Sequence, residues 1–214
     1  GMSDTHVSLL RDKEDREWMM TLRPNAHAGH WKRRVAVAKS PDLHRWPEPT
    51  TVVVPEDADE IYGMPAFLYE GVYIGFAQRF HSSASSTVDI ELMFSRDGLR
   101  WERTRQAFIP LGEAGDFDSH CIYTNDRMIR VGDELWMYYT GKNARHNAEF
   151  SVKRSAIGLG RLRLDGFVCL DASDARLLAA KHLAAAKEDR RFSPEVGAVL
   201  TRPFYWEGER LAIN

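Results

Sequence analysis

The segment FLYEGVYIGF (67–76) decides the fold, together with ELMFSRDGLRW (91–101), which follows it. The first segment is typical of a β-hairpin, because two apolar and aromatic runs flank Glu70 and Gly71, and glycine tolerates the positive φ of a tight turn. The second segment is typical of a strand that ends in a turn and continues at a tryptophan. Two consecutive hairpins of this kind make a unit of four antiparallel strands.

The same two patterns recur along the chain. Copies of the hairpin lie at 9–20, 129–139 and 204–213, and copies of the strand and turn lie at 35–46 and 157–167. Self-similarity at such a period is typical of stacked supersecondary units, and four antiparallel strands make one propeller blade. We therefore predict an all-β chain, a single β-propeller domain over residues 1–214, with about three and a half blades.

Propellers normally contain roughly four to eight blades, so this count leaves the closure of the ring open. Three interpretations remain: the chain is part of a longer protein, the ring closes irregularly, or a second copy of the chain completes it as a homo-oligomer.

Aspartates recur in the turns of the strand-and-turn pattern, at Asp42, Asp97 and Asp165. An aspartate in a turn can accept hydrogen bonds from its own backbone. A catalytic residue has no reason to recur once per unit, so we interpret these three residues as structural.

One segment departs from the strand pattern. Residues 172–192 are rich in Ala, Leu and Lys, Asp174 can act as an N-cap, and the leucines recur on one helical face. We predict one inserted helix near 174–190.

Composition excludes several classes of partner and cofactor. The net charge is −2, which gives no electrostatic reason to bind nucleic acid or an anionic membrane. No apolar run is long enough to cross a bilayer, and the first residues lack a secretory signal, which favours the cytoplasm. His27 and His30 are three residues apart but have no third ligand nearby in the sequence, so we predict neither a metal nor a cofactor.

Acidic residues precede three of the hairpins, within 57–65, 112–126 and 193–203. The innermost strand of each blade lines the central channel, so these segments would direct their carboxylates toward one axis. Two carboxylates on either side of a glycosidic bond are what glycoside hydrolysis requires. The catalytic candidates are Asp118, Glu60 and Glu195. His120 follows Asp118 by two residues, which would place both side chains on one face of a strand.

Polar and aromatic residues around these segments are candidates for binding the substrate. Asp89 and Glu91 alternate along one strand and so share a face; if that face points inward they are site residues, and if outward they are ordinary polar residues. His81 and His146 are candidates for contacts at the rim. The substrate-binding candidates are Asp59, Tyr62, Arg79, Asp89, Glu91, His120, Lys142 and Asn143.

The chain resembles a known family over most of residues 7–214. The resemblance rests on SPDLHRW (40–46), SRDGLRW (95–101), FIPLGEAGDFDSHCIY (108–123), WMYYTG (136–141) and GLGRLRLDGFVCLDA (158–172). These motifs are similar to five-bladed β-propeller glycosidases, namely the amino-terminal domain of glycoside hydrolase family 32 and the related family 43.

The resemblance implies a five-bladed propeller that attacks an anomeric carbon of a carbohydrate with acidic residues in its channel. Asp118, in the GDFD stretch, is the acid that the resemblance transfers. The W-M-N-D-P-N-G, R-D-P and E-C motifs of family 32 are absent. Two functions follow: a glycoside hydrolase, or a non-catalytic propeller that binds a carbohydrate or a protein.

Overall fold

The structure is a computed structural model that describes residues 6–12, 14, 16–24, 32–55 and 58–168. Within these ranges the chain forms thirteen β-strands and one short 3₁₀ helix. The chain divides into two compact units, Gly1–Arg161 and Leu162–Asn214, and residues 162–168 are the described part of the second. The prediction of an all-β chain is confirmed for the described residues.

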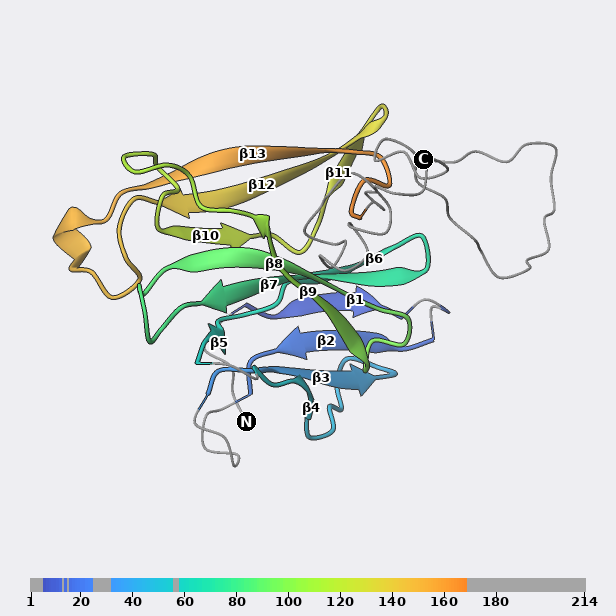
Figure 1. Ribbon diagram of the computed structural model, residues 1–214. Coiled ribbons are helices and arrows are strands. Elements are labelled where there is room, and N and C mark those ends of the chain that lie inside the picture. Colours follow the sequence, from blue (N-terminus) through green and yellow to red (C-terminus); the bar gives the residue numbers. More distant parts are fainter. Residues whose placement is uncertain (1–5, 13, 15, 25–31, 56–57, 169–214) are drawn as a thin grey trace, which may run out of the picture. The chain divides into compact units, whose positions relative to one another are not determined.

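The first blade is a four-stranded antiparallel sheet in the order β1-β2-β3-β4 (Figure 1). Its strands are β1 (Ser8–Arg11), β2 (Trp18–Leu22), β3 (Val35–Ser40) and β4 (Thr50–Val53). Consecutive strands are neighbours throughout, as the hairpin and strand-and-turn patterns predict.

The second blade contains β5 (Glu60–Ile61), β6 (Ala66–Tyr69), β7 (Val72–Phe80), β8 (Val88–Ser95) and β9 (Trp101–Ile109). Both β5 and β6 pair with β7, so together they are one interrupted innermost strand. The predicted turn between β6 and β7 is present, with positive φ at Glu70 (46°) and Gly71 (75°).

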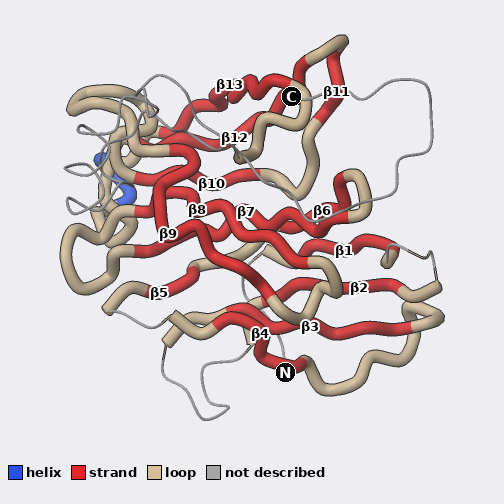
Figure 2. The backbone as a smooth tube through the Cα atoms, turned by 45° about the vertical axis from the view of Figure 1, so that its right-hand side comes forward, coloured by secondary structure: helices blue, strands red, loops and turns tan. Residues whose placement is uncertain are grey.

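The third blade repeats this plan with β10 (Cys121–Thr124), β11 (Ile129–Val131), β12 (Glu134–Lys142) and β13 (Ser155–Arg163). Both β10 and β11 pair with β12, so the innermost strand is again interrupted. The 3₁₀ helix η1 (Phe150–Val152) lies between β12 and β13. A parallel pair between Cys121 and Val88 joins the second and third blades into one nine-stranded sheet (Figure 2).

Apolar side chains fill the spaces between blades. The first and second blades share a cluster of Val35, Val53, Ile61, Met64, Ala77 and Met93, all almost fully buried. On the other face of the second blade, Phe80 and Val88 pack with Cys121 of the third blade. Each sheet is therefore stabilised by burial against its neighbour, which is how blades of a propeller stack.

Two of the three repeated turns have the same hydrogen bonds. The Asp42 carboxylate accepts hydrogen bonds from the backbone N–H of His44 (2.9 Å) and Arg45 (3.0 Å), and the Trp46 indole donates to the Leu43 carbonyl (2.9 Å). These contacts confirm the predicted structural role of the turn aspartate.

The second turn repeats the first in detail. The Asp97 carboxylate accepts from Leu99 (2.8 Å) and Arg100 (2.7 Å), and the Trp101 indole donates to the Gly98 carbonyl (3.0 Å).

The third turn differs. Asp165 itself has a positive φ (58°), whereas in the first two turns the residue after the aspartate does, at Leu43 (64°) and Gly98 (76°). The prediction that all three turns have the same structure was therefore wrong for the third. Here the Gly166 N–H donates a hydrogen bond to the Arg163 carbonyl and closes a tight turn of a different kind.

The predicted helix near 174–190 and the hairpin copy at 204–213 lie outside the described residues. Across the ranges given above, the chain contains no helix of the length and apolarity needed to cross a membrane.

Candidate functional site

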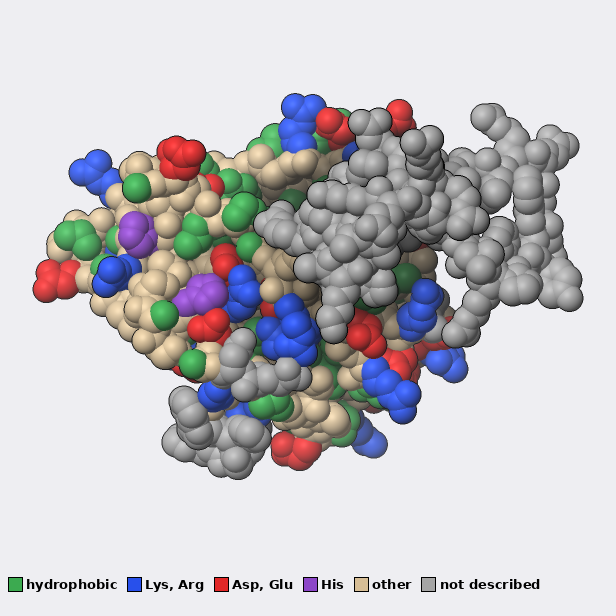
Figure 3. Space-filling model, viewed as in Figure 1, with side chains coloured by type: hydrophobic (Ala, Val, Ile, Leu, Met, Phe, Trp, Pro, Cys, Tyr) green, Lys and Arg blue, Asp and Glu red, His purple; other side chains and the backbone are tan. Residues whose placement is uncertain are grey.

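One row of paired residues runs across the nine-stranded sheet near the ends of its strands. It consists of Glu60, Phe80, Val88, Cys121 and Lys142, each paired with the next in the strand register. We call this part of the molecule the site end. Acidic, basic and histidine side chains gather over these strand ends, on the left of the space-filling view (Figure 3).

Six of the predicted site residues, from separate segments of the sequence, lie at the site end, on both faces of the sheet. Three lie in or beside β5, two face each other on β7 and β8, and one ends β12: Asp59, Glu60, Tyr62, Arg79, Asp89 and Lys142.

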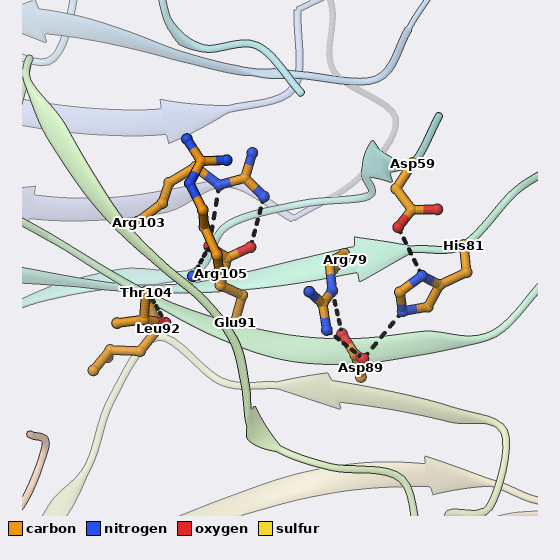
Figure 4. Close-up of polar contacts among 9 residues, drawn as sticks. All are labelled: Asp59, Arg79, His81, Asp89, Glu91, Leu92, Arg103, Thr104 and Arg105. Carbon is orange, nitrogen blue, oxygen red and sulfur yellow. Dashed lines mark hydrogen bonds and ion pairs between the residues drawn. The ribbon is translucent and has the colours of Figure 1, made fainter. Parts of the chain in front are cut away.

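A histidine connects two carboxylates at the site end (Figure 4). The His81 Nδ1 atom lies 2.8 Å from Asp59 Oδ2, and its Nε2 atom lies 3.0 Å from Asp89 Oδ2. The Arg79 guanidinium donates two hydrogen bonds to Asp89, at 2.9 and 2.8 Å. Because both ring nitrogens of His81 face carboxylates, the imidazolium form satisfies the arrangement best.

The protonation states follow from these contacts. The hydrogen bond to Asp89 is the main cause that raises the pKa of His81 above its ordinary value of 6.5. Burial disfavours the charged form of Asp89, but the hydrogen bonds from His81 and Arg79 outweigh burial and lower the pKa of its carboxyl. Asp89 is therefore an ionised hydrogen-bond acceptor at neutral pH and is not suited to act as a general acid.

Glu60 is held by an arginine of the first blade. Its carboxylate accepts hydrogen bonds from the Arg33 guanidinium at 3.1 and 2.9 Å and from the Arg33 backbone N–H at 3.0 Å. Burial opposes ionisation of Glu60, but the hydrogen bonds from Arg33 and Ser82 and the charge of Arg33 outweigh burial and lower the pKa of Glu60. Like Asp89, Glu60 is ionised and paired.

Aromatic rings pack beside Glu60, on the face of the second blade that meets the third. The Tyr62 ring makes edge contacts with Tyr123 (centroids 5.7 Å apart), His146 (4.8 Å) and Phe80 (6.2 Å). The Lys142 ammonium lies 5.1 Å from the centroid of the Tyr123 ring. We call Tyr62, Phe80, Tyr123 and His146 the aromatic cluster.

Asp118 lies at the same end of the third blade but on the other face of its sheet. Its carboxylate accepts a hydrogen bond of 2.7 Å from the Tyr139 hydroxyl. Residues paired directly across two strands share a face, so Tyr139 and Gly141 lie on the face opposite to Tyr123 and Lys142. Through the row of paired residues, Glu60 shares the face of Lys142, so Asp118 and Glu60 lie on opposite faces, whereas Asp89, one residue along from Val88, lies on the face of Gly141.

The predicted relationship between Asp118 and His120 was wrong. Both residues lie in the loop before β10 and not in a strand, so the alternation of a strand does not apply. His120 Nδ1 instead lies 2.9 Å from the Ser119 hydroxyl.

Glu91 is inside the second blade. Its side chain is fully buried and accepts two hydrogen bonds from the Arg103 guanidinium, at 3.0 and 2.7 Å. It also accepts from the backbone N–H of Arg105 (2.8 Å), a residue with positive φ (58°) beside a register shift in the β8–β9 pairing. Glu91 therefore stabilises an irregular strand. Figure 4 shows Glu91 apart from Asp89 and its partners Arg79 and His81.

The other predicted residues are placed as follows. The Asn143 side chain accepts a hydrogen bond from the Arg154 backbone N–H (2.9 Å), which closes the connection between β12 and β13. Glu195 lies outside the described residues.

Three further residues lie at the site end: Arg33, His81 and His146. The two histidines were expected only at the rim, and the contacts of all three were not predicted, because their partners Glu60, Asp59 and Tyr123 are 22 to 27 residues away in sequence. In the described part of the chain, no group of three His, Cys, Asp or Glu side chains is arranged to hold a metal ion.

A separate pocket of ≈ 370 Å³ lies away from the site end. It is lined by residues of β1, the start of β2 and β6, and by residues 126–128 before β11. None of the predicted site residues lines it, so the polar groups of the site end define the candidate site.

Solved structures resemble this chain at low sequence identity. An N-acetylgalactosamine deacetylase from F. plautii, in complex with blood group B trisaccharide, matches 75% of this chain and 50% of its own, with a TM-score of 0.58 and 14% identity. The family 117 glycoside hydrolase Zg3597 from Zobellia galactanivorans matches 72% of this chain and 51% of its own, with a TM-score of 0.54 and 14% identity.

The Bombyx mori GH32 β-fructofuranosidase BmSUC1 matches 72% of this chain and 31% of its own, with a TM-score of 0.53 and 12% identity. The chain has a glycosidase-like β-propeller fold. It spans about half the length of these proteins, or less, and at such identity the likeness shows the fold alone. No known protein family matches the sequence. No curated protein matches it either.

Proposed function

We propose that this propeller binds a carbohydrate at its site end and hydrolyses a glycosidic bond there. The observation that supports the proposal is that polar residues from separate segments, among them Glu60, Asp89 and Lys142, lie at one end of a fold that resembles those of glycoside hydrolases. Sugar hydroxyls need hydrogen-bond donors and acceptors, and sugar rings pack against aromatic faces. The site end supplies both kinds of group.

Hydrolysis requires carboxylates in two different states, one protonated and one ionised. Glu60 and Asp89 supply ionised carboxylates, which can stabilise positive charge at the anomeric carbon. Asp118, which accepts a hydrogen bond from Tyr139, and Glu195, which lies outside the described residues, stay predicted catalytic residues.

A panel of chromogenic glycosides with a parallel glycan array tests the proposal. We expect turnover of at least one glycoside by the wild-type chain and its loss in Asp118→Asn, with the melting temperature near that of the wild type because Asn can still accept the Tyr139 hydrogen bond. Asp133→Asn, in the exposed β11–β12 turn, is the matched control and should keep full activity. An active Asp118→Asn variant would remove Asp118 from the mechanism.

Binding without catalysis is the second candidate function. The pairing of Glu60 with Arg33 and of Asp89 with Arg79 favours it, because both carboxylates are engaged by arginine. Glycan binding without turnover of any glycoside would support this function over hydrolysis. Neither binding nor turnover would contradict both.

The single domain over residues 1–214, the five-bladed ring and its completion by a second copy stay predictions. Size-exclusion chromatography with light scattering tests the last of these: a dimer supports a shared ring, and a monomer contradicts it.

A further inference from the structure

Basic side chains surround the aromatic cluster. The Arg33 guanidinium carbon lies 5.4 Å from the Phe80 ring centroid and 5.8 Å from that of Tyr62. The Lys142 ammonium lies over Tyr123, and the Lys153 ammonium donates a hydrogen bond of 2.8 Å to the His146 carbonyl. The Arg23 guanidinium carbon lies 4.9 Å from the Tyr62 ring centroid, so four cations surround these four touching rings.

The positive charge exceeds the negative charge here. Glu60 pairs with Arg33, whereas no ion pair between a carboxylate and Lys142 or Lys153 is present in the described residues. Burial is the largest cause that lowers the pKa of His146, and the charges of Arg33, Lys153 and Lys142 lower it further. The electrostatic potential that disfavours protonation of His146 also favours an anion at the same place.

His146 shares a hydrogen bond with the Tyr123 hydroxyl, with 2.8 Å between its Nδ1 atom and the phenolic oxygen. Because the pKa of His146 is lowered from 6.5, its ring is mainly neutral at neutral pH. A neutral imidazole carries a proton on one ring nitrogen, so His146 adds a polar group to the cluster without adding a charge.

We propose that the aromatic cluster, with Lys142 and Lys153, binds an oxyanion carried by a sugar, such as the carboxylate of a uronic acid or a phosphate ester. The proposal rests on the proposed function and specifies its substrate class: an acidic saccharide. The sugar ring packs against the tyrosines, and its anionic group pairs with the lysines, because hydrogen bonds between charged partners are stronger than those between neutral ones.

The test measures dissociation constants by ligand-observed NMR for D-glucuronate, D-glucose 6-phosphate, D-glucose and inorganic phosphate. We expect at least one acidic sugar to bind about tenfold more tightly than D-glucose at low salt, and the preference to shrink in high salt. Glucuronate and glucose 6-phosphate distinguish a carboxylate from a phosphate as the recognised group.

Lys142→Met removes the charge and keeps an apolar stem over Tyr123. We expect it to abolish most of the preference for the acidic sugar over D-glucose. Lys39→Met, in β3 of the first blade, changes the net charge equally and should keep the preference.

Three outcomes overturn the proposal. Equal binding of acidic and neutral sugars would contradict it and leave carbohydrate binding standing. An unchanged preference in Lys142→Met would contradict it as well. Binding of inorganic phosphate with no binding of any sugar would contradict both this proposal and the proposed carbohydrate site.

Discussion

Glu91 and Arg103 form an ion pair with two hydrogen bonds, and the Glu91 side chain is fully buried in the second blade. A carboxylate in that position cannot reach a substrate. Its contacts stabilise the irregular pairing of β8 and β9 instead.

Glu91→Gln should destabilise the fold by about 3 kcal/mol, because it leaves the buried Arg103 guanidinium without this carboxylate. Urea unfolding followed by tryptophan fluorescence measures the change. Glu134→Gln removes a similar hydrogen-bonded ion pair with Arg161 on an exposed surface, and it should change the free energy of unfolding far less. Equal effects of the two substitutions would contradict a structural role that depends on burial.

Gly141 has no room for a side chain. A Cβ atom there would lie 2.5 Å from the Asp118 Cβ and 2.6 Å from the Phe117 ring. We expect Gly141→Ala to cost about 1–3 kcal/mol, since the loop that holds Asp118 must move. Gly160→Ala on β13 is the control, because its Cβ would have only ordinary contacts, the nearest at 3.6 Å. Equal losses of stability in the two variants would mean that Asp118 and Phe117 do not pack closely against Gly141.

Leu43 occupies the position in the first turn that Gly98 occupies in the second, and both have positive φ. A non-glycine residue is strained in that conformation, and Leu43 is partly exposed, so little packing is lost on its removal. Leu43→Gly should therefore stabilise the chain by about 0.5 kcal/mol, after the entropy that glycine loses on folding. Thermal unfolding would show a higher midpoint. A lower midpoint would mean that the leucine side chain contributes more than its strain costs.

The contribution of His81 to stability should depend on pH. The folded-state pKa of His81 is raised above 6.5, so protonated His81 stabilises the fold fully below about pH 6.5. This contribution disappears as the pH rises through the raised pKa. Unfolding free energies measured from pH 5.5 to 8.5 should fall with rising pH in the wild type and fall less in His81→Asn.

His44→Asn, at an exposed position of the first turn, is the matched control for His81 and should keep the wild-type slope. An identical slope in wild type and His81→Asn would show that the bridge between Asp59 and Asp89 does not need the imidazolium.

The contribution of Asp89 to stability should be lost in acid. Because the pKa of Asp89 is lowered from 3.8, its contribution is present above about pH 3.8 and disappears as the pH falls through the lowered value.

Local patterns were enough to predict the strands, the hairpin turn at Glu70-Gly71 and the hydrogen bonds of Asp42 and Asp97. Each of these features depends on residues within a few positions of one another, where alternation and turn chemistry act directly. The interruption of the innermost strands was not predicted. Only their pairing with a common partner, β7, shows that β5 and β6 form one interrupted strand, and this pairing is not visible in the sequence.

The candidate site was predicted in part. The acidic segment before the second hairpin indicated Asp59 and Glu60, and both lie at the site end, because residues that precede equivalent strands come to one end of a stacked fold. The pairing of Glu60 and Asp89 with arginines was not predicted, and neither was the side of the sheet on which Asp118 lies.

The amino-acid sequence by itself determined the repeating hairpins, the turn aspartates and the end of the blades at which polar residues gather, because period and turn chemistry are local properties. Tertiary structure alone decided which carboxylates pair with arginine, that His81 joins Asp59 to Asp89, and that Asp118 and Lys142 lie on opposite faces of one sheet. Those relationships depend on strand register and on packing between blades, which bring together groups that are far apart in the chain.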